Sequence, residues 1–185
     1  PNEGDYRWGD VDFMMDEALT RGARVTLVVG RKVPRWPECY IPDWAENFDE
    51  AKQNAALLRA LAAVVERYKG HKALLRWQIE NEPFFNYGRC PDFDLALLDA
   101  ELELVRALDD RPIQLTVSGE LESWRPAAAK ADILGISMYR VTWNDFFGFF
   151  YYPVTPAFYR SRARFFESLP VIVSDARRQV AGPAD

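Results

Sequence analysis

The sequence predicts an α/β protein built on a (β/α)8 TIM barrel, of which the chain holds only a part. Short apolar segments alternate with helix-like segments along the 185 residues, an order typical of parallel strands joined by right-handed crossovers. No Gly-rich phosphate loop follows any of the apolar segments, which argues against an open nucleotide-binding sheet. Five strands are predicted, whereas a complete barrel has eight.

The helices are predicted from their spacing of apolar residues. Ala51, Ala55, Leu58, Ala62 and Val65 recur at spacings of four, three, four and three, which places them on one helix face. The predicted helices cover about residues 10–19, with Asp10 as the N-cap and Gly22 as the stop, and then 51–69, 95–108, 126–130 and 157–167.

The strands are predicted from short, mainly apolar segments, as expected for parallel strands covered on both faces. These segments are residues 25–30, 74–80, 113–117, 133–139 and 169–174. Residues 31–47 contain three prolines and two tryptophans and are predicted to form a long, structured loop. Residues 140–156 are predicted to form an aromatic-rich loop.

Composition excludes several classes of function. The formal net charge is −5, which argues against a nucleic acid or an anionic membrane as partner, because both select basic surfaces. No apolar segment approaches the roughly 20 residues that span a bilayer. The first residues have no signal-peptide character, but we expect the N-terminus of a longer protein to be missing, so localisation is left open.

The cysteine and histidine content argues against metal chemistry. Cys39 and Cys90 are too few for a disulfide scaffold or a four-cysteine zinc site. We expect two free thiols, with a bridge as the alternative if the two preceding strands are neighbours. His71, the only histidine, starts a predicted strand and is expected to be structural, which leaves no Ser-His-Asp triad. Neither a metal nor a cofactor is predicted.

Carboxylate, amide and aromatic side chains follow the predicted strands, where parallel strands of a barrel gather their functional groups. Two carboxylates in an aromatic-lined cleft fit glycoside hydrolysis, in which one protonates the leaving oxygen and the other attacks the sugar or activates water. For each aromatic residue, packing against the protein's own barrel is the alternative to sugar contact. The candidates are Arg31, Trp36, Asn81, Glu82, Ser118, Glu120, Tyr139, Trp143 and Asp175.

The segment WQIENEP at residues 77–83 resembles the end of the fourth strand in clan A of the glycoside hydrolases, the retaining cellulase, mannanase and β-galactosidase superfamily. This resemblance implies that Glu82 is the general acid/base and that Asn81 holds a sugar 2-hydroxyl. Residues 30–39 (GRKVPRWPEC) and 137–140 (SMYR) resemble a poorly characterised branch of cellulase-like bacterial proteins. The resemblance covers nearly the whole chain, as strands three to seven, and implies one partial barrel domain over residues 1–185.

The same resemblance implies a nucleophile at the end of the last predicted strand. The family has glutamate there, whereas this chain has Asp175, whose side chain is shorter by one methylene, roughly 1.5 Å. The expected activity is therefore cleavage of β-linked oligo- or polysaccharides by Glu82 and Asp175, impaired by the aspartate and by the partial barrel. The alternatives are a non-catalytic carbohydrate-binding or scaffold barrel, and an inactive fragment.

Overall fold

The structure is a computed structural model that describes residues 2–119, 122–139, 141–144, 146, 148–151, 154–166 and 169–176. It divides into two compact units, each of which is described by itself. Unit 1 comprises Pro1–Asn81 and Tyr87–Ile113. Unit 2 comprises Glu82–Asn86 and Gln114–Asp185. The prediction of a single domain over residues 1–185 stays a prediction.

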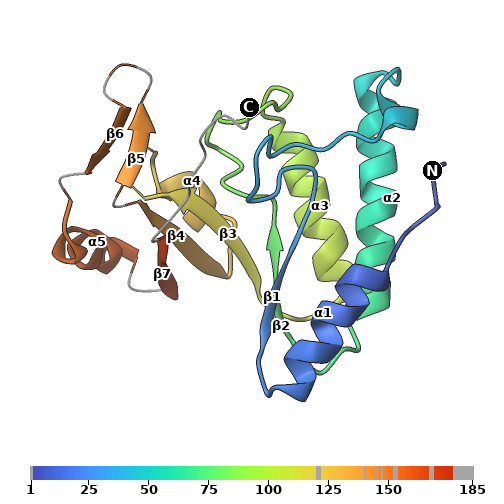
Figure 1. Cartoon of the computed structure of the whole chain (residues 1–185), viewed down its shortest axis with the longest axis horizontal. Helices are drawn as coiled ribbons and strands as arrows, with labels where there is room; N and C mark the ends of the chain where they lie inside the picture. The colour runs from blue at the N-terminus through green and yellow to red at the C-terminus, as the bar shows by residue number, and fades with distance from the viewer. Residues whose placement is uncertain are drawn as a thin grey trace. The chain divides into compact units, whose positions relative to one another are not determined.

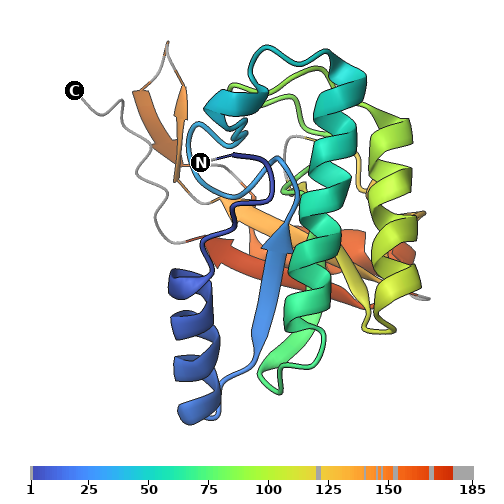
Figure 2. The ribbon, with the colours of Figure 1, turned by 90° about the vertical axis from the view of Figure 1, so that its right-hand side faces the viewer.

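Unit 1 contains α1 (Gly9–Thr20), β1 (Val25–Val29), the short 3-10 helix η1 (Asp43–Ala45), α2 (Glu50–Tyr68), β2 (Leu74–Ile79) and α3 (Leu95–Leu108). β1 and β2 pair in parallel, with Leu27 opposite Trp77 and Val29 opposite Ile79. Helices α2 and α3 lie side by side (Figures 1 and 2). The predicted strand–helix alternation is confirmed for this unit.

The helix ends of unit 1 follow from their side chains. The carboxylate of Asp49 accepts a hydrogen bond from Lys52 N at the start of α2, and that of Asp94 accepts from the first turn of α3. Gly22, with φ of +67°, takes the left-handed conformation that ends α1, as predicted. The prediction of Asp10 as N-cap is wrong, because α1 already includes Gly9 and its N-cap, Trp8, makes no side-chain cap bond.

The core of unit 1 lies where the two helices cover the strands. Trp77 is fully buried, and its indole N–H donates to the carboxylate of Asp109 over 2.9 Å. This bond satisfies the only polar atom of a large buried ring, so burial of the aromatic surface leaves no hydrogen-bond donor without a partner. The other fully buried apolar residues of this unit include Met15, Leu61, Val65, Ile79, Leu98 and Val105.

Unit 2 contains three parallel strands in the order β3 (Ile113–Ser118), β4 (Ile133–Tyr139) and β7 (Val171–Ala176). Its helices are α4 (Arg125–Ala128), α5 (Pro156–Ala163) and the 3-10 helix η2 (Arg164–Phe166). The last strand extends two residues beyond the prediction, so Asp175 lies within β7, opposite Met138 of β4, instead of directly after the strand.

The aromatic segment of unit 2 differs from the prediction. Instead of a plain loop, it contains an antiparallel hairpin of β5 (Val141–Asn144) and β6 (Gly148–Tyr151) (Figure 1). β-Branched and aromatic residues favour strands, and Gly148, with φ of +68°, takes a backbone conformation that side chains disfavour. The aromatic residues of this segment therefore indicate strands and not a loop.

Cys39 and Cys90 form a disulfide between two loops of unit 1, so the expectation of two free thiols is wrong. The parallel pairing of β1 with β2 places the loops that follow the two strands next to each other. A bridge was expected only if the two strands are neighbours, and the sequence alone does not reveal strand order.

Within the described residues, no helix is long and apolar enough to cross a bilayer.

Removal of this disulfide should destabilise the protein. The bridge closes a loop across 51 positions, so replacing both Cys39 and Cys90 by serine should lower the free energy of unfolding by about 2–4 kcal/mol, because the unfolded chain regains entropy. Denaturant unfolding with and without reductant measures this loss, and reductant should leave the double variant unchanged. Two reactive thiols in the unreduced, unfolded wild type would contradict the bridge.

Candidate functional site

The backbone at the end of β2 is strained. Glu80 and Glu82 have φ values of +55° and +46°, in the left-handed region that residues other than glycine rarely occupy. Hydrogen bonds hold each residue of the turn: Glu80 N donates to Val29 O over 2.8 Å, and Asn81 N donates to Lys32 O over 2.8 Å. Strain held in this way is common at functional sites, so the turn is the candidate site.

Glu82 is positioned within unit 2. Its backbone N–H donates to the hydroxyl oxygen of Thr116 on β3 over 2.9 Å, and its carbonyl accepts from Phe85 N over 2.9 Å. The residue is only 3% exposed. A carboxylic acid that is nearly enclosed and has a fixed backbone is suited to proton transfer to a bound substrate.

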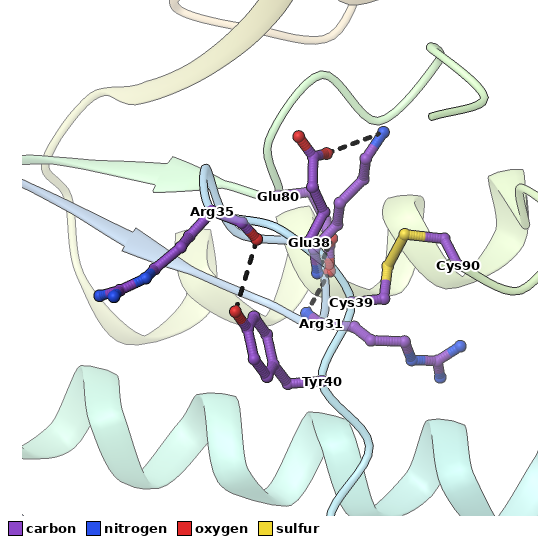
Figure 3. Close-up of a disulfide and its surroundings, with 8 residues drawn as sticks. Arg31, Arg35, Glu38, Cys39, Tyr40, Glu80 and Cys90 are labelled. Carbon is purple, nitrogen blue, oxygen red and sulfur yellow. Dashed lines mark hydrogen bonds and ion pairs between the residues drawn. A yellow bond between two sulfur atoms is a disulfide. The ribbon is translucent and has the colours of Figure 1, made fainter. Parts of the chain in front are cut away.

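Glu80 is bound to the loop that follows β1. Its Oε1 accepts a hydrogen bond from Arg31 N and its Oε2 accepts one from Lys32 N, each over 2.6 Å; Figure 3 shows this carboxylate beside the loop. Gly30 lies so close that an added Cβ would be 2.3 Å from Glu80 Oε1. Because Gly30 also has φ of +126°, only glycine fits at this position.

Glu101 of α3 is a second buried acid beside Glu80. It is 1% exposed and forms a side-chain hydrogen bond with Glu80. Burial and the neighbouring Glu80 charge raise the pKa of Glu101 to about 10, while burial raises the pKa of Glu80, opposed by the two N–H donors. Both Glu80 oxygens accept from the backbone, so the shared proton lies on Glu101.

Sequence reasoning missed Glu101, although a signal was present. The residue falls among Leu98, Leu102 and Val105, which are the buried residues of α3. A charged residue on the apolar face of a helix needs a partner or a proton. The spacing could therefore have marked Glu101 as a buried acid, but the partner could not be named without the fold.

A second buried polar contact lies in the loop after β1. The Lys32 ammonium is 3.7 Å from Glu38 Oε2, and both side chains are 8% exposed. Glu38 also has a left-handed backbone, with φ of +73°. An ion pair enclosed in this way restricts the loop, since separating it would leave a buried charge without compensation.

The predicted substrate-binding residues have different surroundings. Arg31 donates from its guanidinium to Asn54 Oδ1 of α2 over 2.7 Å, so its side chain is engaged with that helix. Asn81 is buried at the end of β2, and Trp36 is exposed on the loop after β1. Glu120 lies outside the described residues, as do the side chains of Tyr139, Trp143 and Asp175.

The remaining predictions concern single groups. His71 is close to Asp16, with Nε2 3.2 Å from Oδ1, and its Nδ1 accepts a hydrogen bond from Ala73 N. The structural role of His71 stays a prediction. In the described ranges, no group of three His, Cys, Asp or Glu side chains could hold a metal ion.

Solved structures show which proteins share this fold. A β-galactosidase from Rahnella sp. R3 superimposes with a TM-score of 0.65 at 9% identity, over 99% of this chain and 44% of its own. A catalytic mutant of a GH42 β-galactosidase from G. stearothermophilus has a TM-score of 0.58 at 15% identity, over 77% of this chain and 34% of its own. A GH2 β-galacturonidase from Eisenbergiella tayi has a TM-score of 0.57 at 13% identity, over 94% and 28%.

These similarities establish the fold alone. The α/β class with parallel strands is confirmed, and glycosidases are among the proteins that share it. The chain spans less than half the length of each of these three structures. No protein-family profile matches the chain, and no curated protein is significantly similar to it.

Variants of the Glu80–Glu101 pair should separate its two roles. Glu80→Gln replaces one acceptor oxygen with an NH2 group, which leaves a buried backbone N–H of Arg31 or Lys32 without an acceptor and should cost about 1–3 kcal/mol. Glu101→Gln retains a neutral donor and should cost much less. Denaturant unfolding compares them, with exposed Glu103→Gln as control. An equal loss for Glu101→Gln would contradict a protonated Glu101.

Stability should fall as the pH rises. Because the folded pKa of Glu101 lies near 10, above the ordinary value of 4.5, its contribution is complete below pH 4.5 and is lost toward pH 10. The positive charge of Arg31 lowers the pKa of Glu101, whereas the negative charge of Asp94 raises it further. The free energy of unfolding should fall by at most about 1.4 kcal/mol per pH unit. Urea unfolding from pH 5 to 9 should give a shallower slope for Glu101→Gln; parallel slopes would refute the buried proton.

Proposed function

We propose that this chain is part of a clan A glycoside hydrolase that acts on β-linked glycans, with Glu82 as general acid/base and Asp175 as nucleophile. The observation that carries the proposal is the buried Glu82 at the end of β2, in a strained turn held by Thr116. A fold shared with β-galactosidases and a β-galacturonidase supports it. The partial (β/α)8 barrel, covering strands three to seven, is part of the same proposal.

The mechanism requires two carboxyl groups with different tasks. Glu82 protonates the glycosidic oxygen while Asp175 attacks the anomeric carbon, which gives a glycosyl-enzyme intermediate. Water then hydrolyses this intermediate with Glu82 as base. Both residues belong to unit 2, where β7 pairs with β4 and β4 pairs with β3.

The length of Asp175 decides how well this mechanism runs. Retaining enzymes hold their carboxyl groups about 5–5.5 Å apart, and inverting enzymes about 6.5–9.5 Å apart. An aspartate in place of glutamate withdraws the carboxylate by roughly 1.5 Å, which moves the pair away from the retaining range. Slow turnover is the consequence we infer.

The remaining site residues are proposed as sugar ligands. Asn81 holds the 2-hydroxyl, and Trp36, Tyr139 and Trp143 offer ring faces to the apolar C–H faces of sugars. Glu120 and Arg31 supply polar contacts, although Arg31 also anchors the loop through Asn54. The shorter Asp175 favours one second candidate function, a barrel that binds carbohydrate without cleaving it.

Glu82→Gln should lower kcat/KM for β-linked disaccharides by about 10²–10⁴-fold, because their alkoxide leaving group needs a proton that the amide cannot supply. Exposed Glu103→Gln is the matched control and should leave hydrolysis unchanged. Unchanged hydrolysis by Glu82→Gln would remove Glu82 from the mechanism.

Asp175 variants give the companion test. Asp175→Asn should abolish turnover, whereas Asp175→Glu should raise it by restoring the missing methylene. Glycan binding without release of reducing sugar from either the wild type or Asp175→Glu would instead identify the non-catalytic barrel.

A further inference from the structure

Two aromatic rings of unit 1 are exposed side by side on separate loops. Trp36 is 54% exposed and Tyr87 is 43% exposed, and their ring centroids are 6.0 Å apart with an interplanar angle of 59°. Trp36 lies in the loop after β1 and Tyr87 in the loop after β2. We call these two rings the aromatic platform. Exposed rings in contact mark a binding surface more often than isolated ones do.

The platform is held by covalent and hydrogen bonds. The Cys39–Cys90 disulfide joins the two loops, and Figure 3 shows it beside Tyr40 and Arg31. Arg89 N donates to Pro37 O over 2.9 Å, and the Tyr40 hydroxyl donates to Trp36 O over 2.9 Å. A platform fixed in this way loses little entropy when a ligand binds.

Glycine is required where the loops meet. Gly88 has φ of +88°, and an added Cβ would be 2.7 Å from Pro37 O. The close approach of the two backbones therefore depends on the missing side chain. The buried Lys32–Glu38 ion pair restrains the same loop.

A guanidinium lies at the platform. The Arg89 Cζ atom is 5.8 Å from the centroid of the Trp36 ring, and the Arg89 side chain is exposed. Within the part of the chain that the structure describes, Arg89 forms no ion pair with a carboxylate. A planar guanidinium without an anionic partner is suited to bidentate binding of a ligand carboxylate.

We propose that the platform and Arg89 bind a uronic acid unit of the glycan, with the sugar ring on Trp36 and Tyr87 and its carboxylate on Arg89. The inference rests on the proposed function for the glycan class of the ligand. Aromatic faces accept the C–H face of a pyranose, and the guanidinium distinguishes an acidic sugar from its neutral counterpart. The disulfide and Arg89 N position the two loops that carry these groups.

Calorimetry on the Glu82→Gln protein tests this, with a β-linked triuronide and the neutral trisaccharide of the same linkage as probes. The triuronide should bind about tenfold more tightly than the neutral probe. Arg89→Ala should remove this preference, and Trp36→Ala should weaken both probes by about tenfold. Exposed Arg24→Ala and Phe13→Ala are the matched controls and should leave binding unchanged.

The outcomes separate this inference from the proposed function. Equal binding of the two probes, or Arg89→Ala and Trp36→Ala proteins that bind like the controls, would overturn the uronate site even if the wild type hydrolyses β-linked disaccharides. A triuronide that binds as expected to a wild type without hydrolytic activity would support the site and reject catalysis. Far-ultraviolet circular dichroism of each variant confirms that lost binding is not lost folding.

Discussion

The arrangement of unit 1 depends on the hydrogen bonds of the buried Glu80 carboxylate. This carboxylate accepts hydrogen bonds from the N–H groups of Arg31 and Lys32 and from the protonated carboxyl group of Glu101, so one buried group joins the end of β2, the loop after β1 and helix α3. Position 30 has room only for glycine, because the Glu80 carboxyl group occupies the space that a side chain would need. Removing a buried acceptor of this kind costs more than the bond itself is worth, since the donors remain enclosed.

The strained turn at the end of β2 follows from this arrangement. Glu80 turns its carboxylate to the loop after β1, and the left-handed residues Glu80 and Glu82 place Asn81 between them with its N–H on Lys32 O. Such conformations cost about 1–3 kcal/mol each and persist only where surrounding bonds determine them. The loop after β1, which Glu80 holds, also contains the Lys32–Glu38 ion pair and one end of the disulfide. Glu82 and the aromatic platform therefore both lie on segments that are close in sequence to the hydrogen bonds of Glu80.

Much of the fold was predictable because periodicity is a local property. The apolar spacing of residues 95–108 matched α3, and residues 133–139 matched β4. The hairpin of β5 and β6 was missed because aromatic residues serve both strands and packed loops. In the site, Glu82 was identified from its position after an apolar strand. Glu101 was missed because its partner is 21 positions away in the sequence and adjacent only after folding.

By itself, the sequence determined the α/β class, the order of the parallel strands along the chain and the carboxylate Glu82 that follows β2. These features are predictable because helix and strand periods and strand ends depend on residues that are close in the sequence. Only the tertiary structure decided that Cys39 bonds Cys90, that Arg31 turns to Asn54 and that Glu101 keeps its proton. Each of these depends on burial and on contacts between distant segments, and neither exists in the unfolded chain.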